Sequence, residues 1–222
     1  MERCSDVFER NGFTGATLTQ MVVASGFTRG AFYFHFESKD ALAEAIVTDQ
    51  AASWVDLFER MRAVESDPLR ALLRFAYASA ALYQRDIVVR AASRLINERV
   101  LIARQLPETY PWWVATVHRL LTESEAAGLL SPDADRLGGG TRGLDTLAGY
   151  LVASWHGTQQ QAAAGTADLP GTMHAGWQIV LSSISRDPEP KRSMLALNDE
   201  LDLAMRTRPE TIIPPALPVA DD

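Results

Sequence analysis

Four polar side chains that lie within eight residues of one another carry groups that can hydrogen-bond to nucleotides. They are Thr28, Arg29, Tyr33 and His35. An arginine can pair bidentately with O6 and N7 of guanine, whereas a tyrosine hydroxyl and an imidazole N–H suit phosphate oxygens. Gly30 has no side chain and would let the backbone approach a groove closely. The cluster therefore predicts contact with a nucleic-acid duplex, if the surrounding elements form a helix that can enter a groove.

The segment around this cluster carries the local signals of two short helices joined by a tight turn. Thr17 and Gln20 have the spacing of a capping box, so a helix is expected to begin after Thr17. Gly26 ends that helix, because glycine accepts the left-handed conformation that a tight exit needs. Thr28 is expected to cap the second helix, residues 29–34. Two short helices with a glycine in the turn are typical of a helix-turn-helix that places its second helix in the DNA major groove.

The aromatic residues of the second helix alternate with the polar ones. Phe32, Phe34 and Phe36 are expected to pack in the core, while Tyr33 and His35 face outward toward phosphate oxygens. Ser38 is expected to cap a third, long helix that runs to about residue 63. The pattern makes double-stranded DNA the leading candidate partner.

Composition permits this interpretation without requiring it. The chain has 222 residues, 47% of them hydrophobic, and a formal net charge of −7. No apolar run reaches the roughly 18 residues of a membrane-spanning helix, and no signal peptide is visible, so a cytoplasmic protein that does not enter a membrane is expected. The single cysteine, Cys4, excludes an intrachain disulfide framework and is expected to face the core of a helical region.

The charge balance of the N-terminal region conflicts with strong DNA binding. Residues 1–60 hold five Lys or Arg against nine Asp or Glu, whereas DNA-binding domains are usually basic. Helix N-termini can bind phosphate through free N–H groups without formal charge, which softens the conflict. The first helix ends at Asn11-Gly12 after only about nine residues, so we expect it to be truncated and an upstream basic arm to be missing.

The rest of the chain has the 3.6-residue periodicity of helices and no sustained β-alternation, so the expected fold class is all-α with nine or ten helices. Asp67-Pro68 and Asp86 are helix starts, and Gly138-Gly139-Gly140 breaks the chain before a long apolar helix over residues 141–164. The expected organisation is a helix-turn-helix domain over residues 1–46, a helical ligand-binding and dimerisation domain over 47–206, and an unordered Pro-rich tail over 207–222.

Residues 12–46, GFTGATLTQMVVASGFTRGAFYFHFESKDALAEAI, resemble the DNA-binding domain of the TetR family of repressors. The resemblance implies a three-helix head, a long fourth helix as lever, and an all-helical body that dimerises and binds a small molecule. Lys39 resembles the family's phosphate-contacting lysine. The residues that the resemblance and the chemistry together assign to DNA are Thr17, Thr28, Arg29, Gly30, Tyr33, His35 and Lys39.

A narrower resemblance links the body to the γ-butyrolactone receptors of antibiotic-producing actinomycetes. It rests on RDIVVRAASRLINE (residues 85–98), on GAFYFHF, and on Trp112, seven residues before Arg119-Leu120-Leu121. It implies a repressor released by a small diffusible signal of butyrolactone, butenolide or furan type. The GGGTRGLDT stretch, residues 138–146, departs from the pattern as an insertion. The expected ligand contacts are Gln50, Tyr83, Trp112, Thr116 and Thr158, with Trp113 packing elsewhere.

Several alternatives stay open. Trp112 and the threonines fit an ordinary core as well as a pocket. Apolar residues of the last long helices fit either a twofold interface or the core of one chain: Leu147, Tyr150, Leu151, Trp177 and Val180. A drug-responsive repressor of an efflux pump and a pseudo-receptor without a ligand remain possible functions. An enzyme is disfavoured, because the four histidines are scattered and no HExxH, CxxC or GxSxG motif occurs. No metal or cofactor is expected.

Overall fold

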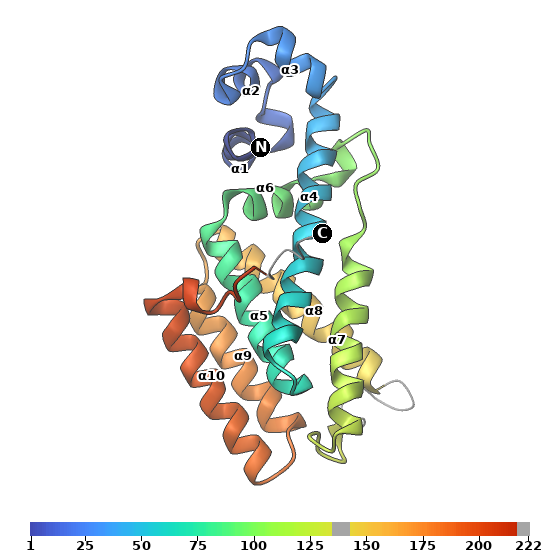
Figure 1. The fold of residues 1–222 in the computed structure, drawn as a ribbon, viewed down its shortest axis with the longest axis vertical. Helices are drawn as coiled ribbons and strands as arrows, with labels where there is room; N and C mark the ends of the chain where they lie inside the picture. The colour runs from blue at the N-terminus through green and yellow to red at the C-terminus, as the bar shows by residue number, and fades with distance from the viewer. Residues whose placement is uncertain (135–142, 217–222) are drawn as a thin grey trace, which may run out of the picture. The chain divides into compact units, whose positions relative to one another are not determined.

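The computed structural model describes residues 1–134 and 143–216, which form ten α-helices and no paired strands longer than an isolated bridge (Figure 1). The all-α expectation is therefore confirmed. In chain order the helices are α1 Glu2–Gly15, α2 Leu18–Ser25, α3 Arg29–His35, α4 Lys39–Val64, α5 Pro68–Arg85, α6 Ile87–Asn97, α7 Thr109–Ala126, α8 Gly143–Ala163, α9 Leu169–Ile184 and α10 Glu189–Thr207, with 3₁₀ turns η1 Arg99–Leu101 and η3 Pro209–Thr211. Among the described residues, no helix is long and apolar enough to span a bilayer.

The local signals in the first forty residues form as predicted. Thr17 and Gln20 make the reciprocal capping box at the start of α2. Gly26 ends α2 in the left-handed conformation, at φ 74°. The hydroxyl of Thr28 accepts from the amide of Ala31 at 3.3 Å and so caps α3. These bonds satisfy helix-end groups within three residues of chain, which is why sequence alone places them.

The chain divides into two compact units. Unit 1 contains Met1–Asp56 and Leu82–Glu108, and unit 2 contains Leu57–Ala81 and Thr109–Asp222. Both α4 and α5 contribute residues to each unit, because the divisions fall inside these helices. The compact unit that holds the helix-turn-helix thus includes α6 and the segment after it, well beyond residue 46.

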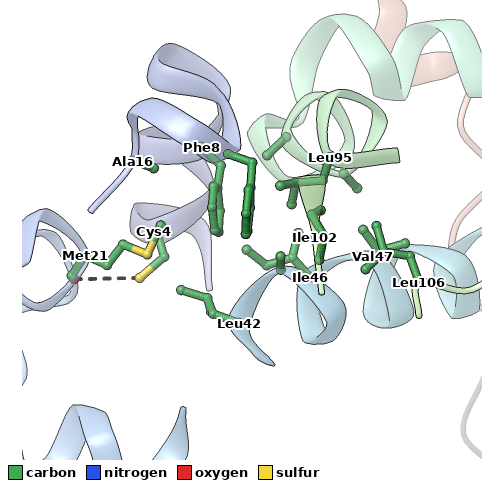
Figure 2. Close-up of a cluster of buried hydrophobic side chains, with 14 of the residues drawn as sticks. Cys4, Phe8, Ala16, Met21, Leu42, Ile46, Val47, Leu95, Ile102 and Leu106 are labelled. Atoms are coloured by element: carbon green, nitrogen blue, oxygen red, sulfur yellow. Dashed lines mark hydrogen bonds between the residues drawn. The ribbon is translucent and has the colours of Figure 1, made fainter. Parts of the chain in front are cut away.

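The core of unit 1 is built from the helix-turn-helix, the first turns of α4, and α6 with its following loop. Figure 2 shows Leu95 and Ile102 on the same cluster as Phe8 and Ile46. Phe8 stacks on Phe13 with ring centroids 6.2 Å apart and planes 8° from parallel. All of these side chains are less than one tenth exposed, so the three-helix head does not close its own core without residues 87–106.

Cys4 lies in this core, as predicted. It is 4% exposed, and its Sγ lies 3.8 Å from the carbonyl oxygen of Met21 (Figure 2). Burial raises the pKa of the Cys4 thiol, which disfavours the reactive thiolate. It therefore packs as a small apolar side chain.

A polar clasp joins α6 to the end of α1. Gly12 interrupts α1 at φ 67° and ψ −179°, a conformation essentially restricted to glycine. At this kink the amide of Phe13 donates to Glu98 Oε2 at 2.5 Å, and Arg94 donates to the carbonyl of Glu9 at 2.6 Å. Arg94 on α6 also pairs with Glu98, which caps the end of α6, at 3.0 Å. The two side chains thus support each other while satisfying backbone groups of α1.

In unit 2, α7 packs against α8, and α9 lies beside α10 (Figure 1). The hydroxyl of Tyr77 on α5 donates to Asn198 Oδ1 on α10 at 2.8 Å, and burial is the main cause of the raised pKa of Tyr77. The amide of Asn198 donates in turn to the carbonyl of His174 on α9 at 3.1 Å. This buried chain of hydrogen bonds holds α5, α9 and α10 in one register.

Part of the C-terminal tail is ordered, so the expectation of an unordered segment from residue 207 was wrong there. The helix α10 continues to Thr207, and η3 follows it. Ile212 is 7% exposed, and Arg60 donates to the carbonyl of Pro214 at 2.7 Å. The composition predicted disorder, but Ile212 of the tail is buried within unit 2. Two parts of the expectations lie outside the described residues. They are the end of the tail, residues 217–222, and the first part of the expected insertion, residues 138–142.

The Gly12→Ala variant should be destabilised. A Cβ at Gly12 would lie 2.7 Å from Glu98 Oε1 and 2.8 Å from Arg94 Nη2, and the positive φ adds about 1–3 kcal/mol of strain. We expect a lower melting temperature by calorimetry. The control is Gly30→Ala, where a Cβ meets nothing within 4 Å and the melting temperature should be unchanged or higher. Equal melting temperatures for Gly12→Ala and the unmodified chain would contradict the clasp.

Candidate nucleic-acid interface and ligand cavity

Six of the seven residues predicted to contact DNA are exposed on one helix-turn-helix. Thr17 lies at the start of α2, Thr28 precedes α3, and the others lie on α3: Arg29, Gly30, Tyr33 and His35. The guanidinium carbon of Arg29 lies 5.7 Å from the ring centroid of Tyr33, one turn along the helix. The arrangement offers a cation, a phenol and an imidazole on a short helix whose N-terminal residues are exposed.

Lys39 differs from these six because its ammonium group is engaged inside the head. Its Nζ donates to the carbonyls of Phe13 at 2.6 Å and Ala16 at 3.0 Å, and lies 4.2 Å from the ring centroid of Phe13. These carbonyls end α1, where a cation is favoured by the helix dipole. Lys39 therefore fastens the start of α4 to the end of α1, with one of its three donors left for a phosphate.

The expectation that Phe34 packs in the core was wrong. Phe32 is 1% exposed and Phe36 is half-buried, but Phe34 is 86% exposed. The error came from applying a two-residue alternation to a helix. In a helix of 3.6 residues per turn, positions 32 and 36 share a face, whereas position 34 is turned about 200° away from position 32.

Carboxylates surround the cations of unit 1. Asp6 pairs with Arg10 at 2.9 Å, and Arg104 binds both Glu44, at 2.6 Å, and Glu37. The amide of Ala103 also donates to Asp40 at 2.7 Å, so the segment after η1 holds the first turn of α4. These pairs reduce the positive charge that this surface could direct at phosphates, in line with the weak electrostatic grip expected from the sequence.

Unit 2 contains a cavity of about 430 Å³ lined by α5, α7, α8 and α9. Its walls are mainly apolar, with three tryptophans: Trp113, Trp155 and Trp177. The size and apolar walls match those of small-molecule sites, which place a few polar groups on a hydrophobic surface.

The polar groups of this cavity are hydroxyls and indoles rather than charges. No Asp, Glu, Lys, Arg or His is among the described residues that line it. The hydroxyls of Ser79 and Thr158 donate to helix carbonyls of Ala76 and Ser154, at 2.8 and 2.9 Å. Their oxygens remain available as acceptors, so the cavity suits a neutral molecule with an apolar body and a hydrogen-bond donor.

The predicted ligand contacts on α7 and α8 fall at different places around this cavity. Thr158 lines it, but Trp112 and Thr116 do not; Trp113, which was expected to pack elsewhere, does. Trp112 meets Phe75 and Trp113 edge-on, with ring centroids 6.4 and 5.3 Å away, and both of these line the cavity. Trp112 therefore supports the wall from behind.

Gln50 and Tyr83 belong to unit 1. Gln50 on α4 is 3% exposed, and its side-chain nitrogen has no hydrogen-bond partner in the described part of the chain. A buried amide without a partner costs free energy, and such groups are found where a ligand or water completes them. Burial raises the pKa of Tyr83, whose phenol is thus held neutral.

The five apolar residues left open between interface and core all line the cavity. Leu147 and Trp177 are buried, while Tyr150 is 61% exposed. His156 on α8 does not line the cavity, and burial lowers its pKa. No cluster of three or more His, Cys, Asp or Glu that could hold a metal occurs within residues 1–134 and 143–216.

Comparison with known proteins agrees with the helix-turn-helix geometry. Residues 5–46 match the family described as bacterial regulatory proteins, tetR family. Residues 5–46 therefore form a DNA-binding domain of the TetR type. The match covers α1, α2, α3 and the first turns of α4, the elements that carry all seven residues predicted to contact DNA.

Proteins that resemble the chain beyond this domain include signal receptors. The chain is 30% identical over 189 residues to the A-factor receptor protein of Streptomyces griseus, an alignment that covers 83% of the chain and 62% of that receptor. It is 27% identical to a γ-butyrolactone receptor described as ArpA-like, with TM-score 0.76, covering 91% of this chain and 94% of the other. It is 25% identical to CprB of Streptomyces coelicolor, solved with its operator sequence, with TM-score 0.74 over 90% and 94% of the two chains.

Sequence reasoning missed three kinds of residue in this chain. The charged residues Arg90, Arg94 and Glu98 could have been found from their spacing of four, which places them along one face of α6 and its C-cap. Phe34 needed the correct helical period. The lining of the cavity had no local signal, because it comes from four helices distant in sequence.

The Arg29→Ala variant should bind operator DNA more weakly and less selectively. A guanine-contacting arginine contributes roughly 1–3 kcal/mol of discrimination, so we expect a loss of about tenfold or more in each half-site. The measurement is a gel-shift titration against operator and unrelated DNA of equal length. Gly30→Ala should also weaken binding without lowering stability, if the backbone approaches the groove at that residue. Normal operator binding by both variants would remove α3 as the reading helix.

Proposed function

We propose that this protein is a transcriptional repressor that binds operator DNA as a homodimer and is released by a small neutral signal molecule. The observation that carries the proposal is the combination of an exposed helix-turn-helix with an uncharged cavity in one chain. The proteins named above include a γ-butyrolactone receptor, an A-factor receptor and a protein solved with its operator sequence. Control of antibiotic or other secondary-metabolite genes, in the cytoplasm, is the role that the resemblance to receptors of antibiotic-producing actinomycetes implies.

The seven residues assigned to DNA divide by chemistry. Arg29 and Thr28 would read base edges, while Thr17, Tyr33 and His35 would contact phosphates. Gly30 would let the backbone of α3 approach the groove closely, and Lys39 would donate its remaining hydrogen bond to a phosphate. In a dimer, two such helices can bind successive major grooves only when they are about 34 Å apart, one turn of DNA.

The signal is proposed to be of butyrolactone, butenolide or furan class. Such molecules combine a compact polar ring with an alkyl chain, which suits mainly apolar walls that carry a few hydrogen-bonding groups. Thr158 and Trp113 contact it from the cavity wall, and Trp112 holds that wall. Thr116, Gln50 and Tyr83 remain proposed contacts from the family resemblance, and the unpartnered amide of Gln50 supports its inclusion.

Release follows from linkage between the two binding events. A signal that binds more tightly to the conformation with misplaced heads shifts the population toward that conformation. The same coupling requires operator DNA to weaken signal binding by an equal factor. Helix α4 connects the two units along the chain, because it begins at Lys39 in unit 1 and ends in unit 2.

A repressor of an efflux pump that responds to a drug is the second candidate function. The cavity disfavours cationic drugs, because a buried cation would find no carboxylate among the described lining residues. A neutral drug-like ligand fits the same walls. The two candidates differ in the source of the molecule that releases the protein from DNA.

A gel shift on the promoter DNA next to the protein's own gene tests the proposal. The protein should retard this fragment, and an organic extract of the producing culture should release it. An extract treated with alkali to open lactone rings is the control and should release less. Failure to retard the fragment would overturn the repressor, whereas retardation that extract cannot release would leave a repressor without a signal.

The Trp112→Ala variant should keep DNA binding and lose release. Trp112 supports Phe75 and Trp113, so its removal loosens the cavity wall without touching the helix-turn-helix. The partner variant is Ala76→Phe, which places a ring in the cavity from α5 and should also abolish release. Both are measured as the extract dilution that gives half-release, with melting temperatures as the stability control. Release by both variants at the normal dilution would show that the signal binds elsewhere.

A further inference from the structure

Phe34 is a large apolar side chain left in water on the recognition helix. It is 86% exposed and faces away from Phe32, which is 1% exposed in the head core. The Phe34 ring lies edge-on to the ring of His35, with centroids 5.5 Å apart. Since a buried phenyl ring is worth roughly 1.5–3 kcal/mol over an exposed one, some partner is expected to cover it.

The surroundings of Phe34 are open and small. Gly30, one turn earlier on α3, has nothing within 4 Å of the position of a Cβ, and Ala31 beside it is also exposed. The outermost face of the helix therefore runs from a glycine and an alanine to an unshielded phenyl ring. A flat surface can approach this face closely at its N-terminal end and meet the ring at its C-terminal end.

We propose that Phe34 reads thymine in the operator, by packing its ring against the C5-methyl groups in the major groove. This rests on the proposed function, because it assigns a specificity role within the same DNA interface. Phe34 lies within the matched DNA-binding domain and follows Tyr33, the proposed phosphate contact. The thymine methyl is the apolar group that the major groove displays, and phenylalanine is among the side chains that contact it.

The charge of the head supports an apolar contribution to DNA binding. Arg10 is paired with Asp6, and Lys39 is engaged by two carbonyls, so phosphate attraction supplies little affinity from these two cations. Apolar contact does not depend on counterion release. Burial of Phe34 against methyl groups would thus supply sequence-dependent affinity that this surface does not obtain from charge.

The test removes the methyl groups from the DNA and the ring from the protein. The promoter fragment is amplified either with thymidine or with deoxyuridine triphosphate, which lacks the C5-methyl. Both fragments are titrated with the unmodified chain, Phe34→Ala and Phe34→Leu. The control is Val100→Ala, since Val100 is 87% exposed in unit 1 but lies on η1, outside the helix-turn-helix.

The unmodified chain should lose about fourfold in affinity per methyl contact on deoxyuridine DNA, or about fifteenfold for one contact in each half-site. The Phe34→Ala variant should bind thymidine DNA that much more weakly and show no further loss on deoxyuridine DNA. Phe34→Leu should keep part of the preference, and Val100→Ala should behave as the unmodified chain. Such non-additivity identifies a direct contact between the two changed groups.

Two results would overturn the inference. One is equal affinity of the unmodified chain for both fragments. The other is a methyl preference that persists undiminished in Phe34→Ala. Either result leaves the repressor intact, because the thymidine fragment is still bound. Failure of the unmodified chain to bind the thymidine fragment at all would instead overturn the proposed function, and with it the role of Phe34. Equal melting temperatures show that Phe34→Ala folds, which its exposure leads us to expect.

Discussion

The contact between α6 and the kink in α1 is the constraint on which the head depends. At Gly12 the backbone leaves the helical path, and the freed amide of Phe13 is satisfied by Glu98 rather than by water or by its own helix. Arg94 satisfies the carbonyl of Glu9 from the same face of α6. Since glycine alone accepts this backbone conformation beside a carboxylate, the position of α6 against α1 follows from one residue type at one site.

This contact changes how the DNA-binding head should be understood. Leu95, Ile102 and Leu106 complete an apolar core that α1, α2 and α3 leave open, and Arg104 binds Glu44 and Glu37 at the start of α4. The helix-turn-helix is thus stabilised by a segment some fifty residues or more away in sequence. Any event that shifted residues 87–106 would disturb the packing behind α3, because close-packed cores transmit small displacements. Lys39 adds to this by tying α4 to the end of α1.

The cavity of unit 2 and the surface of the helix-turn-helix differ in chemistry. The cavity in unit 2 excludes charge and offers hydroxyl oxygens, which suits a neutral ligand that loses little hydration on entering. The helix-turn-helix lacks the strong positive charge of many DNA-binding domains and instead exposes a phenol, an imidazole and a phenyl ring around Arg29. In the DNA recognition proposed for this surface, geometry and apolar contact would contribute more than long-range attraction, so the spacing of the two proposed copies would matter for affinity.

The sequence by itself determined the helix-turn-helix, the all-helical fold and the ends of the first helices. The capping box at Thr17, the left-handed Gly26 and the cap at Thr28 each depend on bonds or backbone angles within a few residues, so local spacing sufficed. Only the tertiary structure decided which residues are covered: α6 in the head core, the ordered tail at Ile212, the exposed Phe34, and Trp113 rather than Trp112 in the cavity wall. Burial is set by contacts between segments far apart in the chain, and no periodicity within one helix specifies the neighbour that will cover it.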